Sequence, residues 1–447
     1  MTSSRTYDIT VVGGGLAGTD AAWQAARRGC RVLLCEMRPG VQTPAHRTGD
    51  LAELVCSNSF GSKLPDRARG VLLQEMRQLG SLVAEAADAT AVPAGAALAV
   101  DRDAFAAYIT GKIESHPSIT LCRQEVTDIP QCGPAVLCTG PLTSTALSDA
   151  IRAKFGEELL YFYDAMAPIV DAESIEMNKA FRASRHDRGE TREGDYINCP
   201  FDAPGYHAFV DELITAETIE LRNFEKDDKH FFEACLPVEI LARRNPDSLR
   251  FGPLTPIGLT DPHTGRRPYA ALQLRQDNAA ASLYSIVGAQ TNLKWGEQER
   301  IFRMAPGLER AEFVRFGQMH RNTYINAPKI LLPTMQTRQR ANLFFAGQLA
   351  GVEGYLGDAA TGWLAGENAA RLVAGNEPLE LPHDTMLGAL THYLAEADAK
   401  HFQPMKANFG IMPPLPNKIR GKQARKQAHA GRAQESFTKW LESIVTM

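Results

Sequence analysis

Residues 8–36 read DITVVGGGLAGTDAAWQAARRGCRVLLCE, and this stretch decides the fold. Ile9–Val12 is a short apolar run with β-branched residues, which predicts a buried strand. It runs into Gly13–Gly18, a complete G-x-G-x-x-G turn, and then into an Ala-rich segment that predicts a helix over 19–28. Arg31–Cys35 predicts a second strand, which ends at Glu36. Strand, turn, helix, strand and acid in this order indicate a dinucleotide-binding fold.

The residues of this fingerprint have different physical tasks. Gly13 permits the tight turn, Gly15 lets a pyrophosphate approach the backbone, and Gly18 lets the helix pack closely on the strand. The phosphates then bind the free N–H groups at the helix N-terminus. Glu36 stands 18 residues after Gly18, close to the spacing of about 20 for the carboxylate that binds the adenosine ribose.

The composition limits the class of protein. A chain of 447 residues is too long for one core, so we expect two domains or one domain with a large insertion. The net charge of −4 means that nucleic acid could be bound only by a local basic patch. The first strand begins too early for a signal peptide, and no apolar run could span a membrane. Eight cysteines without a C-x-x-C pair or zinc-ligand spacing predict a cytoplasmic protein with reduced thiols and no metal site.

The pattern of the first sheet returns late in the chain. Ala135–Gly140 and Asn342–Gly347 each predict a buried strand, and a small-residue helix is expected over Asp358–Leu372. Between them, charged helical segments alternate with Pro-rich turns, and no second fingerprint occurs. We therefore expect an α/β protein whose Rossmann-like domain, of the glutathione-reductase type, comprises residues 1–140 and 329–447. An α+β domain, residues 141–328, would be inserted into it. Within the first part, Val71–Ala87 predicts one helix, and Asp101–Ser115 predicts another with Asp101 as its cap.

A single fingerprint suits either FAD or a nicotinamide cofactor. The late glycine-rich segment GQLAGVEGYLGDAATG, residues 347–362, favours FAD, because a flavin and a helix N-terminus aimed at it need small residues. A nicotinamide dehydrogenase remains open at this point.

Two cysteines stand in unusual surroundings. Cys56 lies in LAELVCSNSF, within a long polar loop after the fingerprint, and Cys235 lies in KHFFEACLPVEIL. A thiolate is well suited to adding to a conjugated carbonyl if its pKa is lowered and it is accessible. The residues alone leave open whether either cysteine is an ordinary thiol.

The C-terminal part is basic. Residues 399–434 contain eight Lys or Arg and no Asp or Glu. Such a run is either a solvated face or a contact with a phosphate backbone.

Six stretches together resemble the folate- and FAD-dependent tRNA (uracil-5-)-methyltransferases, the TrmFO family. They read VVGGGLAGTDAAWQAARRG, TPAHRTGDLAELVCSNSFGS, AVLCTGPLTS, FEACLPVEILARR, QTNLKWGEQ and NLFFAGQLAGVEGYLGDAATGWLAGENAA. They extend from the first strand into the last third of the chain, and the Cys56 loop is more specific than the nucleotide fingerprint.

The resemblance implies an enzyme that forms 5-methyluridine at position 54 of the tRNA T-loop. The carbon would come from 5,10-methylenetetrahydrofolate, and NAD(P)H would supply reducing equivalents through FAD. No membrane contact and no obligate protein partner are expected. The implied contacts with the ADP half of FAD are Gly13, Gly14, Gly15, Leu16, Ala17, Gly18, Glu36, Met37 and Arg38. The implied contacts near the flavin are Gly347, Gly357, Asp358, Ala360, Thr361 and Gly362.

Cys56 and Cys235 coincide with the two functional cysteines of the family. We hypothesise that Cys235 adds to carbon 6 of uracil, and that Cys56 acts as the base at carbon 5 or protects the flavin adduct. The RNA would need cations and aromatic rings. The candidates are Arg182, Arg185, Arg188, Lys294, Trp295, Lys418, Arg420, Lys422, Arg425 and Lys426.

Three other interpretations remain. One is the sister group of folate- and flavin-dependent enzymes that modify the wobble uridine, whose members are longer at the C-terminus. Another is a flavin-dependent oxidoreductase acting on a small molecule, which would leave the basic tail and the Cys56 loop without a purpose. The third is a non-catalytic flavin- or tRNA-binding module.

Overall fold

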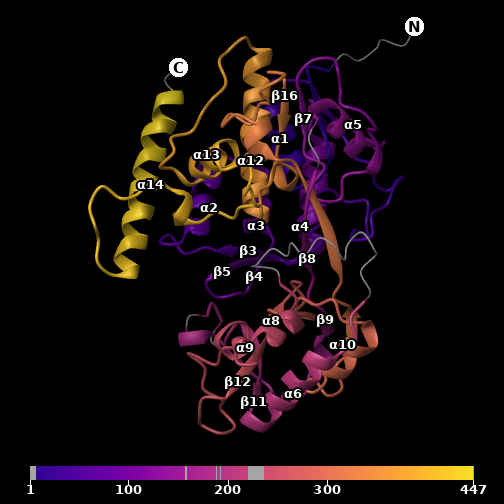
Figure 1. The fold of residues 1–447 in the computed structure, drawn as a ribbon, viewed down its shortest axis with the longest axis vertical. Coiled ribbons are helices and arrows are strands. Elements are labelled where there is room, and N and C mark those ends of the chain that lie inside the picture. The colour runs from indigo at the N-terminus through magenta and orange to yellow at the C-terminus, as the bar shows by residue number, and fades with distance from the viewer. Residues whose placement is uncertain (1–6, 157–158, 188, 192, 220–235, 446–447) are drawn as a thin grey trace.

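A computed structural model of the protein describes residues 7–156, 159–187, 189–191, 193–219 and 236–445 (Figure 1). It has two hydrophobic cores. The first, in the upper half of Figure 1, combines residues 9–159 with residues 324–440. The second, in the lower half, is formed within residues 170–311.

The first core contains a five-stranded parallel sheet with the order β16-β7-β1-β2-β6. Its strands are β1 (Ile9–Val12), β2 (Val32–Cys35), β6 (Ile119–Cys122), β7 (Ala135–Leu137) and β16 (Leu343–Phe345). Val12 pairs with both Cys35 and Leu137, so the carboxyl ends of the central strands meet at one edge. This sheet confirms the predicted α/β class and the expected return of a late strand, because β16 pairs with β7.

The glycine-rich turn is followed by α1 (Leu16–Arg27). The helix begins three residues earlier than the Ala-rich pattern predicts, because Gly15 is its N-cap. The early start puts Leu16 and Ala17 in the first helical turn, at the edge where the strands end.

The remaining N-terminal elements surround this sheet. They are β3 (Ser59–Ser62), β4 (Ala91–Val92) and β5 (Ala97–Val100), which form a small antiparallel sheet, and α2 (Ala68–Leu79), α3 (Leu82–Ala89), α4 (Arg102–Ser115) and α5 (Thr145–Phe155).

The prediction of one helix over Val71–Ala87 is wrong. Gly80 takes a left-handed conformation with φ 70°, which ends α2, and Ser81 caps α3 by accepting a hydrogen bond from the Ala84 N–H. The predicted cap of α4 is confirmed, since the Asp101 carboxylate accepts from two N–H groups in the first turn.

The second core is built on a six-stranded sheet with the order β10-β11-β12-β13-β9-β14. Its elements are β9 (Ile169–Asp171), β10 (Phe181–Ala183), β11 (Tyr196–Phe201), β12 (Ala270–Gln276), β13 (Leu283–Ile286), β14 (Phe313–Arg315), α6 (Ala203–Thr215), α8 (Val238–Arg244), α9 (Ser248–Phe251) and α10 (Trp295–Phe302). The chain enters this half through β8 (Leu160–Ala165) and leaves through β15 (Met319–Tyr324), and these two strands pair with each other.

The last third of the chain returns to the first core. It contains α11 (Ala327–Ile330), α12 (Tyr355–Val373), α13 (Met386–Glu396) and α14 (Lys422–Val445). The buried Glu75 carboxylate on α2 accepts hydrogen bonds from the N–H groups of Met386 and Leu387, which anchors the start of α13. Helix α14 packs on α2 at the left of Figure 1.

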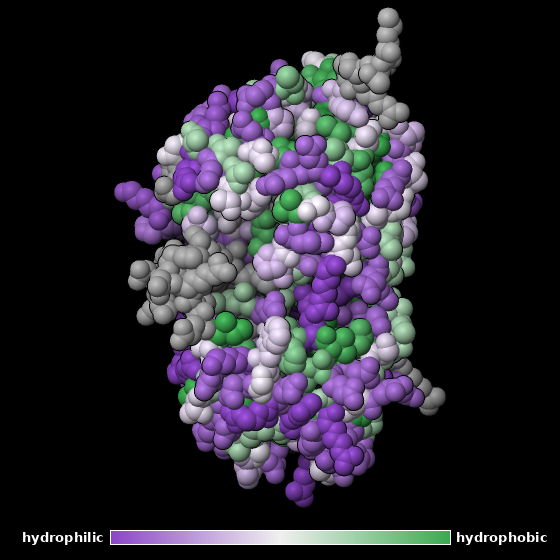
Figure 2. Space-filling view, turned by 90° about the vertical axis from the view of Figure 1, so that its right-hand side faces the viewer, coloured by the Kyte–Doolittle hydropathy of each residue, from purple (hydrophilic) through white to green (hydrophobic). Residues whose placement is uncertain are grey.

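None of the described helices is long and apolar enough to cross a membrane. On the face shown in Figure 2, hydrophobic residues lie in small separate groups among hydrophilic ones.

Helices α1 and α12 are in close contact. A Cβ atom added at Gly362 would lie 2.1 Å from the backbone oxygen of Ala17, and one added at Gly366 would lie 2.3 Å from that of Ala21. Only glycine permits this approach, so the late helix is fitted directly to the helix of the fingerprint.

We expect Gly362→Ala to lower the free energy of unfolding by about 2 kcal/mol or more, because the new methyl group meets backbone rather than a movable side chain. Thermal or urea denaturation measures this. Gly111→Ala is the matched control, since a Cβ at this exposed position of α4 meets nothing within 4 Å. It should raise stability by about 0.5–1 kcal/mol. An equal change in the free energy of unfolding for the two variants would contradict the packing argument.

Candidate functional site

A cavity lies where the strands of the parallel sheet end. It is lined by the β1–α1 turn, the end of β2, the segment after β7 and the start of α12. Of the residues expected to bind the ADP half, it is bordered by Gly13, Gly14, Gly15, Leu16, Ala17, Glu36, Met37 and Arg38. The fingerprint residues therefore share one cavity, except for Gly18, which lies behind the turn.

The glycines of the turn differ in their surroundings. A Cβ at Gly13, where φ is 104°, would lie 2.5 Å from the Cys138 carbonyl oxygen. A Cβ at Gly18 would lie 1.8 Å from the Gly13 carbonyl oxygen. A Cβ at Gly15 would meet no atom within 4 Å. Gly13 and Gly18 are thus required by the chain itself, whereas Gly15 faces open space in the cavity.

Glu36 is held in a buried ionic network. One carboxylate oxygen accepts from the Gly14 N–H at 2.8 Å, and the other accepts from the backbone N–H and the Nε of Arg38, both at 2.9 Å. Arg38 is 2% exposed and also contacts Glu53 at 3.2 Å. Burial alone would raise the pKa of Glu36, but the Arg38 charge and these hydrogen bonds hold it below its ordinary value. The carboxylate is therefore fixed in its charged form beside the turn.

The residues expected near the flavin separate into two groups. Gly347, Gly357 and Asp358 border a cavity. Ala360, Thr361 and Gly362 are buried and line neither of the two main cavities. The Thr361 hydroxyl accepts a hydrogen bond from the Gly347 N–H at 2.9 Å, so it fixes the position of a residue that lines the first cavity.

Asp358 has an unusual environment. Its carboxyl group is buried in the first turn of α12, and its Oδ1 atom has no hydrogen-bond partner among the described residues. Burial, together with the nearby Glu353, raises the pKa of Asp358 well above its ordinary value. A buried oxygen without a partner at a cavity wall fits a ligand that carries hydroxyl groups.

A second cavity adjoins the first and contains Cys56. The two share six lining residues, which are Val55, Pro141, Leu142, Gln348, Tyr355 and Asp358. The second cavity is also lined by Met166, Arg275 and Asn322, which belong to the part of the chain that runs from β8 through β15. It therefore lies where the two halves of the molecule meet.

Tyr355 anchors the backbone of the Cys56 loop. Its hydroxyl oxygen accepts hydrogen bonds from the N–H groups of Cys56 and Ser57, each at 3.1 Å. Burial raises the pKa of this phenol, so it stays neutral. Because Tyr355 borders both cavities, it holds the half-buried cysteine at their boundary.

Two half-buried arginines bind the carbonyl groups of the same loop. Arg102 donates to the Leu54 carbonyl at 2.7 Å and to the Cys56 carbonyl at 3.0 Å. Arg315, on β14, donates to the Val55 carbonyl at 2.8 Å. Burial, followed by the neighbouring charges of Arg102 and Arg47, lowers the pKa of Arg315 to about 10, so it remains protonated near neutral pH.

A third arginine fixes the side chains that follow. Arg275, on β12, donates to the Ser57 hydroxyl and to the Asn58 side-chain oxygen, both at 2.8 Å. Arg102 is neutralised by an ion pair with Asp277 at 2.9 Å, whereas the structure gives neither Arg275 nor Arg315 such an ion pair among the described residues. The Cys56 loop therefore lies in a region of positive charge, which favours anions and thiolates.

Cys235, the second cysteine that the sequence singles out, lies outside the described residues, as does Arg188. None of the described cysteines forms a disulfide.

The RNA-binding candidates of the second half have different environments. Arg182 donates to the Tyr284 hydroxyl at 2.8 Å, and Lys294 pairs with Glu217 at 2.5 Å. Trp295 is 53% exposed and stacks on Phe316, with ring centroids 5.5 Å apart. Arg185 borders a cleft, and its buried Nε has no hydrogen-bond partner among the described residues.

The candidates of the basic C-terminal segment lie in and just before α14. Lys418 and Arg420 are exposed and precede the helix, and Lys422, Arg425 and Lys426 belong to its first turns. This segment is on the first half of the molecule, apart from α10 with Lys294 and Trp295 (Figure 1).

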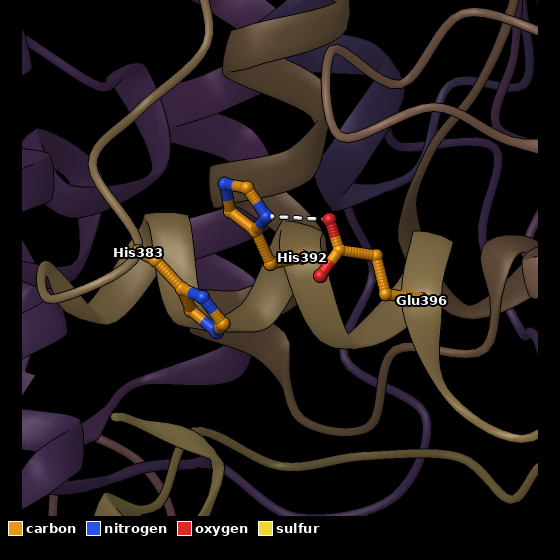
Figure 3. Close-up of side chains that lie close together, drawn as sticks. All are labelled: His383, His392 and Glu396. Atoms are coloured by element: carbon orange, nitrogen blue, oxygen red, sulfur yellow. Dashed lines mark hydrogen bonds and ion pairs between the residues drawn. The ribbon is translucent and has the colours of Figure 1, made fainter. Parts of the chain in front are cut away.

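One cluster of described residues has ligand atoms close enough for a metal ion. It consists of His383, His392 and Glu396, whose atoms lie within 4.8 Å of one another (Figure 3). The ring nitrogens of His392 face Glu396 at 3.0 Å and Glu380 at 3.3 Å, and the His383 ring stacks on it at 13°. The lone pairs of nearly parallel rings do not converge on one point, so the arrangement suits an ion pair. The cluster lines neither of the two main cavities.

Comparison with known proteins identifies the family. The family model described as Glucose inhibited division protein A matches residues 8–377. A methylenetetrahydrofolate–tRNA-(uracil-5-)-methyltransferase TrmFO of Heliobacterium modesticaldum is 56% identical over 97% of this chain and 98% of its own. The TrmFO protein of Enterococcus faecalis is 54% identical over 98% of this chain and all of its own. The chain belongs to the TrmFO family.

A solved structure shares the fold of this TrmFO family member. Aquifex aeolicus GidA in its form II crystal has a TM-score of 0.69 and 18% sequence identity, and the match covers 97% of this chain and 73% of that one. At this identity the likeness concerns the fold, and it supports the predicted FAD-type Rossmann architecture.

Tyr355→Phe removes the oxygen that accepts two backbone N–H groups of the Cys56 loop. We expect a loss of about 1–3 kcal/mol of stability and faster alkylation of Cys56 by iodoacetamide, because the loop is released. Mass spectrometry of the Cys56 peptide measures the rate. Tyr108→Phe, which removes an exposed hydroxyl bonded to Glu85, is the control and should change neither quantity. An unchanged alkylation rate in the Tyr355 variant would refute the anchoring role.

Proposed function

We propose that this protein methylates carbon 5 of uridine 54 in the T-loop of tRNA. The carbon would come from 5,10-methylenetetrahydrofolate, and NAD(P)H would provide electrons through FAD. The observation that carries the proposal is the identity of 53–57% to proteins named as methylenetetrahydrofolate–tRNA-(uracil-5-)-methyltransferases, over nearly the full chain. The cavity around Cys56 supports it, since a half-buried thiol lies next to the nucleotide cavity.

The first cavity fits FAD in three respects. Gly15 leaves space at the start of α1, where a pyrophosphate would meet N–H groups and the positive end of the helix. The charged Glu36 has the lone pairs to accept ribose hydroxyl groups. The unpartnered Asp358 Oδ1 would accept from a hydroxyl of the ribityl chain. Bound FAD, reduced by NAD(P)H, would supply the folate-derived carbon and the hydride that complete the methyl group.

The cavity arrangement suggests a division of the chain. Residues 1–140 and 329–447 would hold FAD, and residues 141–328 would form the opposite wall towards the tRNA. Val55, Tyr355 and Asp358 separate the two cavities, so a base in the second cavity would approach a flavin in the first.

The residues of the chain would activate the uracil. A thiolate of Cys235 would add to carbon 6, which moves an electron pair onto the carbon 5 enolate and makes carbon 5 nucleophilic. After carbon 5 has bonded to the folate-derived carbon, a base removes its proton, and the thiolate leaves from carbon 6. Cys56 would be this base or would protect the flavin adduct. Its carbonyl and N–H groups are held by Arg102 and Tyr355, which fix the position of the thiol.

Two alternatives are disfavoured by particular observations. A wobble-uridine enzyme is disfavoured because the relatives at 53–57% identity are named as tRNA-(uracil-5-)-methyltransferases. An oxidoreductase for a small molecule would leave the basic run of residues 399–434 without a purpose.

Gly15→Ala tests the nucleotide cavity without disturbing the fold. We expect an unchanged melting temperature, because the new methyl group meets no protein atom, and an FAD dissociation constant raised by about tenfold or more, because it occupies the path of the pyrophosphate. Flavin absorbance after purification and titration of the apoprotein measure this. Retention of wild-type FAD affinity would contradict this placement of the phosphates.

The activity itself is tested with unmodified tRNA, methylenetetrahydrofolate and NAD(P)H. We expect 5-methyluridine in the T-loop, and a rate at least about 100-fold lower for Cys56→Ala and Cys235→Ala. Nucleoside analysis after digestion identifies the product and its position. Cys132→Ala, at an exposed cysteine outside both cavities, is the control and should retain the wild-type rate.

Three results would decide against the proposal or its details. An FAD-loaded wild type that forms no 5-methyluridine would leave a flavin oxidoreductase as the better interpretation. Product at the wobble position would favour the sister group. Full activity without folate would refute the carbon source.

A further inference from the structure

A groove on the first half of the molecule concentrates positive charge. It runs between the start of α2 and the first turns of α14, and its lining includes Arg67, Arg69, Lys422, Arg425 and Lys426. These segments are more than 350 residues apart in sequence and are held together by α14 packing on α2. Asp66 reinforces this contact by accepting a hydrogen bond from Gln423 in the first turn of α14.

The cations of the groove are mostly unpaired. Arg67 forms an ion pair with Asp66 at 2.8 Å. Among the described residues, Arg69, Lys422, Arg425 and Lys426 have no such partner, and residues 399–434 contain no acid at all. In the second half of the molecule, cations such as Lys294 and Arg300 are paired with glutamates. Lys422 and Lys426 are also four residues apart on one helix, where like charges repel.

The groove is continuous with the cavity of Cys56. Arg69 and Ala407 line both of them. Arg69 also borders the cleft that contains Arg185, whose buried Nε is unpartnered. An exposed guanidinium thus stands at the point where the groove, the cleft and the Cys56 cavity meet.

The floor of the groove carries an aromatic pair. Phe409 and His429 stack with their rings at 14° and their centroids 5.4 Å apart. Cations on phosphates together with aromatic rings are the usual means of holding a folded or single-stranded RNA segment.

From these observations we infer that the groove between α2 and α14 holds the phosphate backbone of the tRNA substrate, and that Arg69 guides the strand towards the Cys56 cavity. This inference rests on the proposed function and adds the surface that grips the substrate. It distinguishes the α14 cations from Lys294, whose charge is neutralised by Glu217 in the other half.

The test is the triple variant Lys422→Gln, Arg425→Gln and Lys426→Gln in the full-length, FAD-loaded protein. Each lost phosphate contact removes about one unit from the slope of log affinity against log salt concentration. We expect the slope to fall by about two to three units and the affinity for T-arm tRNA to fall at least about tenfold. Oxidation of NAD(P)H by the flavin without tRNA should be unchanged. Arg69→Gln should lower kcat/KM for tRNA in the same assay.

The matched control removes the same charge elsewhere. It is the triple variant Arg266→Gln, Arg267→Gln and Lys439→Gln, whose positions are exposed and outside the groove. It should bind tRNA as the wild type does. Equal weakening by both triple variants would mean a long-range charge effect and would overturn the inference, as would wild-type affinity and slope in the groove variant.

Failure of this inference is distinguishable from failure of the proposed function. If the wild type produces 5-methyluridine and the groove variant retains its affinity, only the groove assignment is wrong. If the groove variant loses affinity for an acidic polypeptide such as polyglutamate but not for tRNA, the groove serves a protein partner and the inference is overturned.

Discussion

The structure depends on the close approach of α1 and α12. Gly362 and Gly366 let the backbone of the late helix contact that of the fingerprint helix, where any side chain would collide with the carbonyl groups of Ala17 and Ala21. This contact brings Gly347 and Asp358 to the ends of the first strands. The nucleotide cavity is therefore a product of helix packing between two parts of the chain that are more than 300 residues apart.

The Cys56 loop depends on side chains that hydrogen-bond to its backbone. The Cys56 loop is not a secondary-structure element, and its carbonyl groups would be costly to bury without partners. Arg102 and Arg315 supply donors, and Tyr355 accepts from the loop's N–H groups. Arg315, which has no ion pair among the described residues, also adds positive charge beside the loop, so one side chain contributes to both structural support and chemical environment.

Local patterns in the sequence predicted local features well. The strand Ile9–Val12, the cap at Asp101 and the return of a strand near residue 343 are confirmed, because apolar runs and capping residues act over a few positions. The single helix expected over Val71–Ala87 is wrong, since the apolar spacing continues across the break at Gly80 and only the backbone reveals its left-handed conformation.

The partners of Cys56 could not have been found in this way. Arg102, Arg275, Arg315 and Tyr355 are scattered along the chain and belong to no shared motif, and only tertiary packing brings them together. Tyr355 did stand within the glycine-rich segment 347–362, but no local pattern relates it to a loop 299 residues earlier. Only part of the groove between α2 and α14 could be predicted from the sequence, because the basic run indicated the α14 cations but not Arg67 or Arg69.

The distribution of these anchors has a consequence for biosynthesis. During synthesis, Arg102 is made soon after the Cys56 loop. Arg275 and Arg315 follow much later, and Tyr355 is made last. Until residue 355 has left the ribosome and α12 has docked, the loop lacks the hydroxyl that fixes its N–H groups. The nascent chain therefore carries an unpositioned Cys56 thiol through most of its synthesis, and the loop takes its final geometry only when the last third of the protein has folded onto the first.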